Sequence, residues 1–384
     1  MKTLLFSVLI FICSQTYGAE AKEAPTEHTK LKGLMLQVFG KIQSLRKYMA
    51  SPDEFNNPKN EAYIKNQLKD LAKLTKKADH QKLLNSPNFS FSRSVLQHHI
   101  SEVERTFRVG NKDYARWMLN STTNICMSCH TQLPQTTDVS KELNENSSPL
   151  GRSFSDAEFL FTTRRFKEAL PLYMDFVSEY PKNKFKSSDL ETSVRRVTAI
   201  HARVQRDPEV GYDDLQKMLK NDKLPEYLKS DIKAWSALFK KWQSEESIDP
   251  KTVKEAKLKE FVEDQFDRTL WDRMIPSGDP RVVTYLRVSG ILYEYLNSHP
   301  KSELTPQILL WLAQCEYRLN NNFFYSLGDL YLKECIKSYS KNPIAKKCYE
   351  EYKDNVEMSY TGSRGTYIPP DVRRELNKLR KMVQ

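Results

Sequence analysis

Five consecutive residues carry the most specific chemical signal in this 384-residue sequence. Cys126, Met127, Ser128, Cys129 and His130 form a Cys-x-x-Cys-His motif. On a helix, residues three apart project from the same face, so both thiols can form thioether bonds to the two vinyl groups of one haem. His130, four residues after Cys126, then lies under the iron as the proximal ligand. The motif therefore predicts one covalently bound haem c.

Paired thiols also support two other interpretations. The first is a redox pair, either a simple disulfide or a thioredoxin-like dithiol, and the dithiol would need a βαβ setting. The second is half of a zinc site, which would need a second pair of ligands nearby. The sequence around residues 126–130 offers neither setting, so the haem interpretation is favoured over both.

The N-terminus predicts export. Met1 and Lys2 precede an apolar run over residues 4–13, and Thr16-Tyr17-Gly18 then places small residues three and one positions before Ala19. This is the pattern of a secretory signal peptide at residues 1–18, followed by a flexible leader at 19–27. A run of about ten apolar residues is too short to cross a bilayer, which needs about twenty. We expect a soluble periplasmic protein without a transmembrane segment, in the compartment where c-type haem is attached.

The elements that must position the motif are helical. Apolar residues spaced three and four apart predict four helices within residues 28–134, the last running from about Asn111 into the motif. Short connections between them indicate an antiparallel four-helix bundle. Only 11 glycines occur in 384 residues, which argues against an all-β fold and against phosphate-binding glycine loops. The predicted fold class is all-α.

An exported helical domain with Cys-Met-Ser-Cys-His at the end of its fourth helix resembles the cytochrome c-prime family. The resemblance covers residues 28–134 and depends on the position of the motif and the number of helices. It implies a haem that is either five-coordinate or six-coordinate through a methionine of the first helix. Met35 matches the place of that methionine. The sequence after His130 departs from the family in lacking a basic residue soon after the histidine.

The topology of such a bundle also limits the choice of sixth ligand. The end of the fourth helix lies level with the start of the first, so His28, Leu31 and Met35 on its inward stripe face the haem. Met35 is the candidate ligand, and the alternative is that it belongs only to the core. His28 lies where the helix frays and is the weaker candidate. The pair His98 and His99 is expected at the surface.

The remaining two thirds of the chain predict a second helical domain. Residues 135–153 are polar and are expected to form a linker. The run from Arg164 to Asn183 is similar to the second helix of a tetratricopeptide repeat, although the full consensus is absent. We expect residues 154–384 to form an irregular solenoid of helical hairpins that presents a concave surface to a protein partner. The later helices are expected at about 185–206, 211–220, 224–244, 250–265, 280–298, 304–320, 323–339 and 343–358.

Three further cysteines lie in this second part. A helical hairpin with its turn near residue 341 places Cys335 and Cys348 at equal distances from the turn, so they face each other at the same level. Facing helices can bring Cα atoms into disulfide range, about 4.4–6.8 Å. The sequence predicts a Cys335–Cys348 disulfide and a buried free thiol at Cys315. The alternative is that all three are reduced core residues.

The function expected from these features is non-enzymatic. A haem held in a helical bundle, without nearby acid–base residues, suits single-electron transfer or small-gas binding, and the helical repeat domain would dock a protein partner. The alternative is an envelope interaction scaffold in which the haem is structural or regulatory. A haem peroxidase would need a distal His–Arg pair that is not evident. Acidic residues number 49 and are spread among 60 basic ones, so nucleic-acid binding is not expected.

Overall fold

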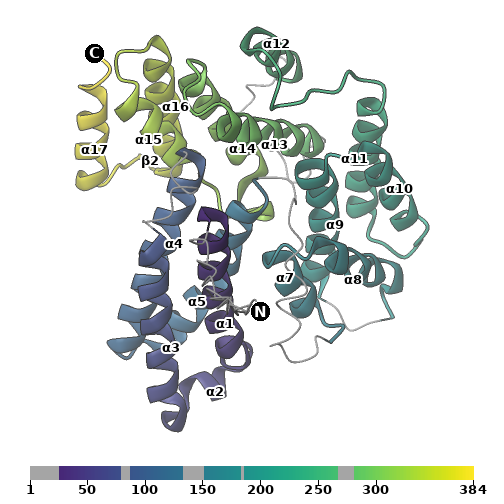
Figure 1. Ribbon diagram of the computed structural model, residues 1–384, viewed down its shortest axis with the longest axis vertical. Helices are drawn as coiled ribbons and strands as arrows, with labels where there is room; N and C mark the ends of the chain where they lie inside the picture. Colours follow the sequence, from purple (N-terminus) through teal and green to yellow (C-terminus); the bar gives the residue numbers. More distant parts are fainter. Residues whose placement is uncertain (1–25, 79–86, 133–150, 183–185, 267–280) are drawn as a thin grey trace, which may run out of the picture.

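A computed structural model describes residues 26–78, 87–132, 151–182, 186–266 and 281–384 of the chain (Figure 1). The fold is all-α, as predicted, and its only strands in these ranges form a small hairpin of β1 (Thr361–Gly362) and β2 (Gly365–Thr366). The predicted signal peptide and most of the predicted leader and linker lie outside the described residues. No helix in the described ranges is long and apolar enough to cross a membrane.

Five helices form the N-terminal group. They are α1 (Glu27–Ala50), α2 (Pro52–Asn56), α3 (Pro58–Lys77), α4 (Pro87–Arg108) and α5 (Lys112–His130). The side chains of Ser51, Asn57 and Asn111 cap the starts of α2, α3 and α5 by accepting backbone N–H bonds. The four predicted helices are therefore present, and the short α2 is an addition that the apolar spacing did not indicate.

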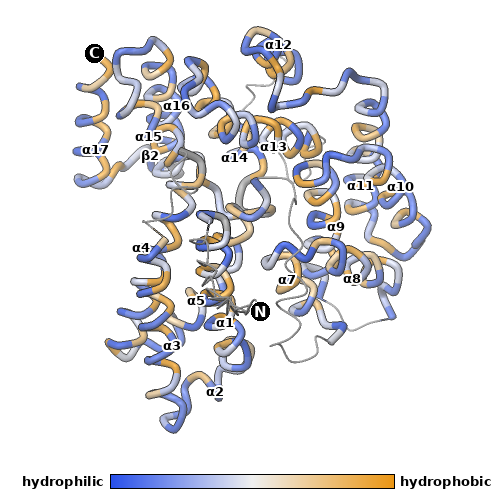
Figure 2. Tube along the Cα trace, in the orientation of Figure 1, coloured by the Kyte–Doolittle hydropathy of each residue, from blue (hydrophilic) through white to orange (hydrophobic). Residues whose placement is uncertain are grey.

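The core of the N-terminal group is concentrated in one half. Helix α1 packs on α3, α3 on α4 and α4 on α5, whereas α1 meets α5 over only a short stretch. Fully buried residues come from the later part of α1, from α2 and from the early part of α5, among them Leu45, Phe55 and Leu119. Along every helix, apolar segments alternate with polar ones, as in amphipathic helices that share a core (Figure 2).

Some apolar side chains of α1 and α4 are only partly buried: Leu31, Met35, Val38, Ile42, Val95 and Leu96. Val38, Ile42 and Leu96 pack at the edge of the N-terminal core, and Val95 packs against the C-terminal core.

The C-terminal group holds the remaining helices. They are α7 (Phe154–Thr162), α8 (Phe166–Glu179), α9 (Ser187–Ala199) with its π-helical continuation η3 (Ile200–Gln205), α10 (Pro208–Met218), α11 (Glu226–Trp242), α12 (Glu255–Gln265), α13 (Val282–Ser298), α14 (Thr305–Phe323), α15 (Gly328–Ser338), α16 (Pro343–Ser359) and α17 (Pro370–Arg380). Neighbours in sequence pack against each other along most of the group. The expected helices are present with small shifts at their ends.

Two of the helix starts were predicted too early. Helix α12 begins at Glu255, whereas it was expected to begin at about residue 250. A helix was expected to begin at Phe323, whereas α14 extends to that residue and α15 begins only at Gly328. In the connection between them, Arg196 donates to the carbonyl of Phe323, and Ser128 donates to the carbonyl of Tyr325 over 2.7 Å. Because side chains from α9 and α5 satisfy these carbonyls, the connection needs no helical N–H partners there.

The two groups meet at the end of α5. Met127, inside the motif, is fully buried and belongs to the large apolar cluster of the C-terminal helices. Phe91 of α4 packs edge-on against Tyr331 of α15, with ring centroids 5.6 Å apart. Helix α7 lies beside both α1 and α5 (Figure 1), and the ring of its Phe159 lies 5.0 Å from that of Phe39. Residues of both groups therefore hold the last turn of α5.

A buried ionic network lies in the C-terminal core. The Arg203 guanidinium donates to Glu316 over 2.7 Å, and both side chains are almost completely buried. The hydroxyl of Tyr293 donates to the same carboxylate over 2.9 Å, and the hydroxyl of Tyr331 donates to that of Tyr293. A buried charge is tolerated when it is paired and hydrogen-bonded, as it is here.

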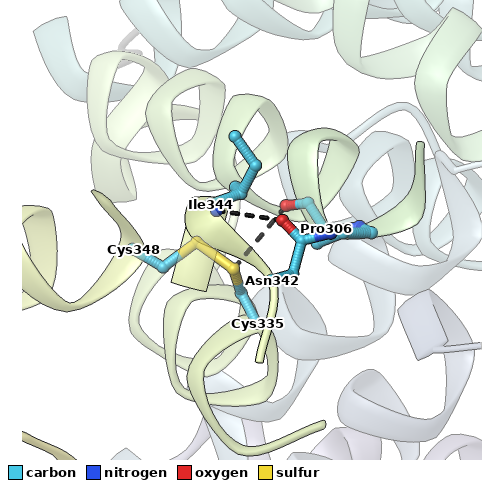
Figure 3. The surroundings of a disulfide bond; sticks show 5 residues. All are labelled: Pro306, Cys335, Asn342, Ile344 and Cys348. Carbon is cyan, nitrogen blue, oxygen red and sulfur yellow. Dashed lines mark hydrogen bonds between the residues drawn. A yellow bond between two sulfur atoms is a disulfide. The ribbon is translucent and has the colours of Figure 1, made fainter. Parts of the chain in front are cut away.

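Cys335 of α15 and Cys348 of α16 form a disulfide, with their Cα atoms 6.3 Å apart (Figure 3). Asn342 caps the start of α16 in the turn between them, accepting from the backbone N–H of Ile344. Cys315 is a buried free thiol. The predicted pairing and the predicted free cysteine are both confirmed.

We expect the double variant Cys335→Ala/Cys348→Ala to lose about 3 kcal/mol of stability, because the bond closes a short loop in the unfolded chain. Urea unfolding followed by circular dichroism measures this loss. A thiol reductant should lower the urea midpoint of the unmodified protein by a similar amount and leave that of the double variant unchanged. A reductant that has no effect on the unmodified protein would contradict the expectation.

Candidate functional site

The Cys-x-x-Cys-His motif forms the last turn of α5. Residues 126–130 are helical throughout, so Cys126, Cys129 and His130 lie together on one side of the helix. Both thiols are free and half-buried, and they are not joined to each other. The structure thus brings together the three residues that the sequence predicted to hold a haem.

The ring of His130 is held in one orientation by a backbone carbonyl. Its Nδ1 lies 2.5 Å from the carbonyl oxygen of Thr162, at the end of α7. A carbonyl oxygen can only accept, so Nδ1 carries the hydrogen and Nε2 keeps its lone pair. Metal-ligating histidines usually donate their second ring N–H to a carboxylate or carbonyl in this way. His130 is therefore in the tautomer that can bind a metal through Nε2.

The end of α7 leaves this carbonyl available. Two backbone bonds close the helix, from the N–H of Arg165 to Leu160 and from the N–H of Arg164 to Phe161. This is the Schellman arrangement, in which one residue takes the left-handed conformation. That residue is Arg164, with φ at 63°. The bonds satisfy the carbonyls of Leu160 and Phe161, and the carbonyl of Thr162 accepts from His130 instead.

The electrostatic surroundings keep the imidazole neutral. Burial lowers the pKa of His130 to about 4, and the nearby guanidinium of Arg164 acts in the same direction. The hydrogen bond to Thr162 opposes both effects only in part. Above about pH 5 the ring therefore carries no charge, which is the state in which histidine binds metals.

The thiols are poor acids in these surroundings. Burial raises the pKa of Cys126 to about 12, and the neighbouring Cys129 raises it further. Burial raises the pKa of Cys129 to about 11, although Arg164 and a hydrogen bond with Ser92 oppose the increase. Dithiol oxidoreductases depend on the opposite property, an acidic thiol that is ionised near neutral pH. These values disfavour the dithiol interpretation.

Among the residues that the structure describes, no group of three or more His, Cys, Asp or Glu side chains is arranged to hold a metal ion. Within the motif, His130 offers a single nitrogen ligand beside two protonated thiols.

Hydrogen bonds from neighbouring elements fix the last turn of α5. The hydroxyl of Ser128 donates to the carbonyl of Tyr325 in the α14–α15 connection. The side-chain amide of Gln132 donates to the hydroxyl of Ser92 on α4 over 3.0 Å. The turn that carries both thiols and His130 is thus attached to α4, to α7 and to the C-terminal core.

The other histidine and methionine candidates lie on α1 and α4. Met35 is half-buried on α1, where it packs against Leu34, Leu74 and Ala78. The side chain of His28 lies outside the described residues. His98 is exposed, as expected.

The expectation for His99 was wrong. Its ring is half-buried between α4 and α5, with Nε2 2.8 Å from the carbonyl of Met118. Burial lowers the pKa of His99, which favours the neutral ring. A histidine beside an apolar stripe can thus reach the backbone of the adjacent helix rather than solvent.

The surroundings of the motif fit a haem. A haem has a broad apolar face, and six apolar side chains of α1 and α4, the helices that flank α5 in the predicted bundle, are partly exposed. Covering such surface stabilises a protein by about 25 cal/mol for each Å² removed from water. A c-type site also needs two free thiols and an axial histidine. Cys126 and Cys129 are free and lie one helical turn apart, and His130 keeps the lone pair on its Nε2.

Two contributors to the site could not be found in the motif itself. Thr162 acts through its backbone carbonyl. Arg164 lies two residues further along, in the turn that ends α7. The one sequence signal is the pair Arg164-Arg165 directly after a helix end without a glycine. No family model, no curated protein and no solved structure matched this chain.

Proposed function

We propose that this chain is a c-type haem protein, with the haem attached through Cys126 and Cys129 and the iron bound by Nε2 of His130. The observation that carries the proposal is the bond from His130 Nδ1 to the carbonyl of Thr162 beside two free thiols. That bond fixes the tautomer and the orientation that an axial ligand requires.

When bound, the haem supplies an iron that can change its charge by one electron or bind a small gas at an open position. Residues of this chain orient the imidazole of His130 and keep it neutral, and apolar side chains would pack against the face of the haem. We infer single-electron transfer or small-gas binding as the function. The alternative is an envelope scaffold in which the haem is structural or regulatory.

The finer architecture belongs to the same proposal. We infer that α1, α3, α4 and α5 act as an antiparallel four-helix haem bundle like that of the cytochrome c-prime family. The C-terminal helices would form an irregular solenoid of hairpins that docks a protein partner on its concave side. Export to the periplasm through a signal peptide at residues 1–18 completes the proposal, since covalent haem attachment occurs outside the cytoplasm.

Optical spectra of the oxidised and reduced protein test the proposed function directly. A c-type haem gives sharp bands on reduction, and their positions distinguish low-spin six-coordinate iron from high-spin five-coordinate iron. Low-spin spectra favour electron transfer, and high-spin spectra that change with carbon monoxide or nitric oxide favour gas binding. A purified protein that shows no haem spectrum after expression with a haem-attachment system would refute the proposal.

We expect Met35→Ala to convert a low-spin spectrum to a high-spin one, because the thioether of Met35 is the proposed sixth ligand. Met49→Ala, a change near the other end of α1, is the matched control and should leave the spectrum unchanged. A low-spin spectrum that persists in Met35→Ala would exclude this residue as the ligand.

A further inference from the structure

We propose that the last helix and the β-hairpin before it form a surface that binds the anionic headgroups of a phospholipid bilayer. This surface, which we call the C-terminal surface, consists of β1, β2 and the outer face of α17 (Figure 1). It includes no residue of the Cys-x-x-Cys-His motif. Binding there would hold the protein on a membrane that no helix in the described ranges can cross.

Positive charge is concentrated in this part of the chain. Residues 361–384 contain six basic and two acidic side chains, so they carry four of the eleven net positive charges of the whole sequence. One of the acidic residues, Glu375, already pairs with Lys333 of α15 over 3.0 Å. All six basic side chains are exposed: Arg364, Arg373, Arg374, Lys378, Arg380 and Lys381.

The fold keeps most of this charge on the outside of α17. Leu376 and Leu379 are buried, and through that side the helix packs on α15 and α16. Arg374, Lys378 and Lys381 are spaced four and three residues apart, so they form one row on the opposite side. Figure 1 shows α17 at the edge of the molecule, where this row faces outward.

Exposed apolar side chains are concentrated in the same place. Among the described residues, eleven large apolar side chains are exposed, and four of them lie within residues 358–382: Met358, Tyr360, Tyr367 and Met382. The backbone N–H of Tyr367 donates to the carbonyl of Tyr360 over 3.0 Å, next to the pair Thr361 and Thr366 of the hairpin. The two tyrosines are therefore cross-strand neighbours on one face of the hairpin. Tyr367 is 70% exposed.

This combination of side chains fits a bilayer better than an acidic protein. Lysine and arginine near an anionic membrane are attracted to the lipid phosphates, and tyrosine rings lie at the level of the headgroups. The core of a protein–protein interface is instead depleted of lysine. The outer face of a single helix can also lie flat along the plane of a bilayer.

Helix α3 offers a row of cations without the neighbouring tyrosine pair. Lys69, Lys73 and Lys76 are exposed and have the same spacing as the row on α17. The exposed tyrosine of α3, Tyr63, packs its ring against that of Tyr48, with centroids 5.7 Å apart. Removal of these three lysines therefore changes the net charge equally and leaves the C-terminal surface intact.

Flotation of the full-length protein with vesicles tests the inference. We expect binding to vesicles made of equal parts of phosphatidylglycerol and phosphatidylcholine, and much weaker binding to phosphatidylcholine alone. Each cation near an anionic bilayer strengthens binding about fivefold, so the triple variant Arg374→Gln/Lys378→Gln/Lys381→Gln should bind about a hundredfold more weakly. Tyr367→Ser, which keeps every charge, should weaken binding several-fold.

Lys69→Gln/Lys73→Gln/Lys76→Gln is the matched control and should bind the mixed vesicles like the unmodified protein. Circular dichroism of each variant verifies that its helices are intact. An equal loss of binding in the two triple variants would overturn the inference, because net charge alone would then explain it. Failure of the unmodified protein to bind the mixed vesicles at low ionic strength would also overturn it. Tighter binding to immobilised polyglutamate than to these vesicles would identify an acidic protein as the partner instead of a bilayer.

Discussion

Replacement of both motif cysteines, Cys126→Ser with Cys129→Ser, should leave no haem on the chain after denaturation. A thioether survives denaturing electrophoresis, whereas a haem held only by coordination and packing is released. Each single variant should retain one thioether, and its intact mass should still include one haem. A gel stained for haem peroxidase activity and the mass of the intact protein measure both outcomes.

Cys315→Ala supplies the matched control, because this buried thiol lies on α14 and outside the motif. It should retain full haem staining. His130→Ala should retain the thioethers and lose the axial nitrogen, so the stain persists while the spectrum changes. If the unmodified protein releases its haem on denaturation, thioether attachment is refuted.

Local patterns in the sequence predicted most of the helices. Asn57 and Asn111 lie directly before apolar stripes and accept the N-cap bonds that start α3 and α5. The Cys335–Cys348 bond could be predicted because two residues equidistant from a hairpin turn must lie level with each other. Each of these features is determined by residues a few positions apart in the sequence or by the position of a single turn.

The support of His130 could not be predicted in this way. Every residue has a backbone carbonyl. The residue type at position 162 therefore does not indicate that its oxygen accepts a hydrogen bond from an imidazole 32 residues away in the sequence. At the connection after α14, Arg196 donates to the carbonyl of Phe323 at the helix end, and Ser128 donates to the carbonyl of Tyr325. Periodicity describes which face of a helix is apolar, but it does not describe which distant side chain meets a given backbone atom.

The position of Met127 shows the same limit for packing. Met127 lies within residues 28–134, which were predicted to form a bundle of their own, yet its side chain is buried in the cluster formed by the C-terminal helices. The motif therefore lies between two groups of helices. The proposed site takes its covalent attachment from α5 and its orienting carbonyl from α7, which a division of the sequence at a linker does not indicate.

Loss of the buried carboxylate at position 316 should cause the largest loss of stability. Glu316 accepts from Arg203 over 2.7 Å and from Tyr293 over 2.9 Å, deep in the C-terminal core. Glu316→Gln removes the negative charge and leaves the guanidinium of Arg203 buried without a counter-charge. Breaking a buried pair in this way costs about 3–5 kcal/mol. Urea unfolding at constant pH measures the cost.

Glu226→Gln is the matched control, since the carboxylate of Glu226 is exposed and pairs with Lys229 at the surface. Exposed pairs contribute little, so its urea midpoint should match that of the unmodified protein. A loss in Glu316→Gln no greater than that in Glu226→Gln would contradict the prediction.

A variant that lacks both charges distinguishes the stability contributed by the ion pair from the cost of leaving one buried charge without a partner. Arg203→Met with Glu316→Leu replaces the ion pair by apolar side chains of similar length, and such exchanges are often neutral. We expect the double variant to be more stable than either Glu316→Leu or Arg203→Met alone, and the double-mutant cycle built from these three variants measures the coupling. If Glu316→Gln does not fold, the double variant should still fold. A double variant that is less stable than both of its single variants would show that the unpaired charge is not what destabilises them.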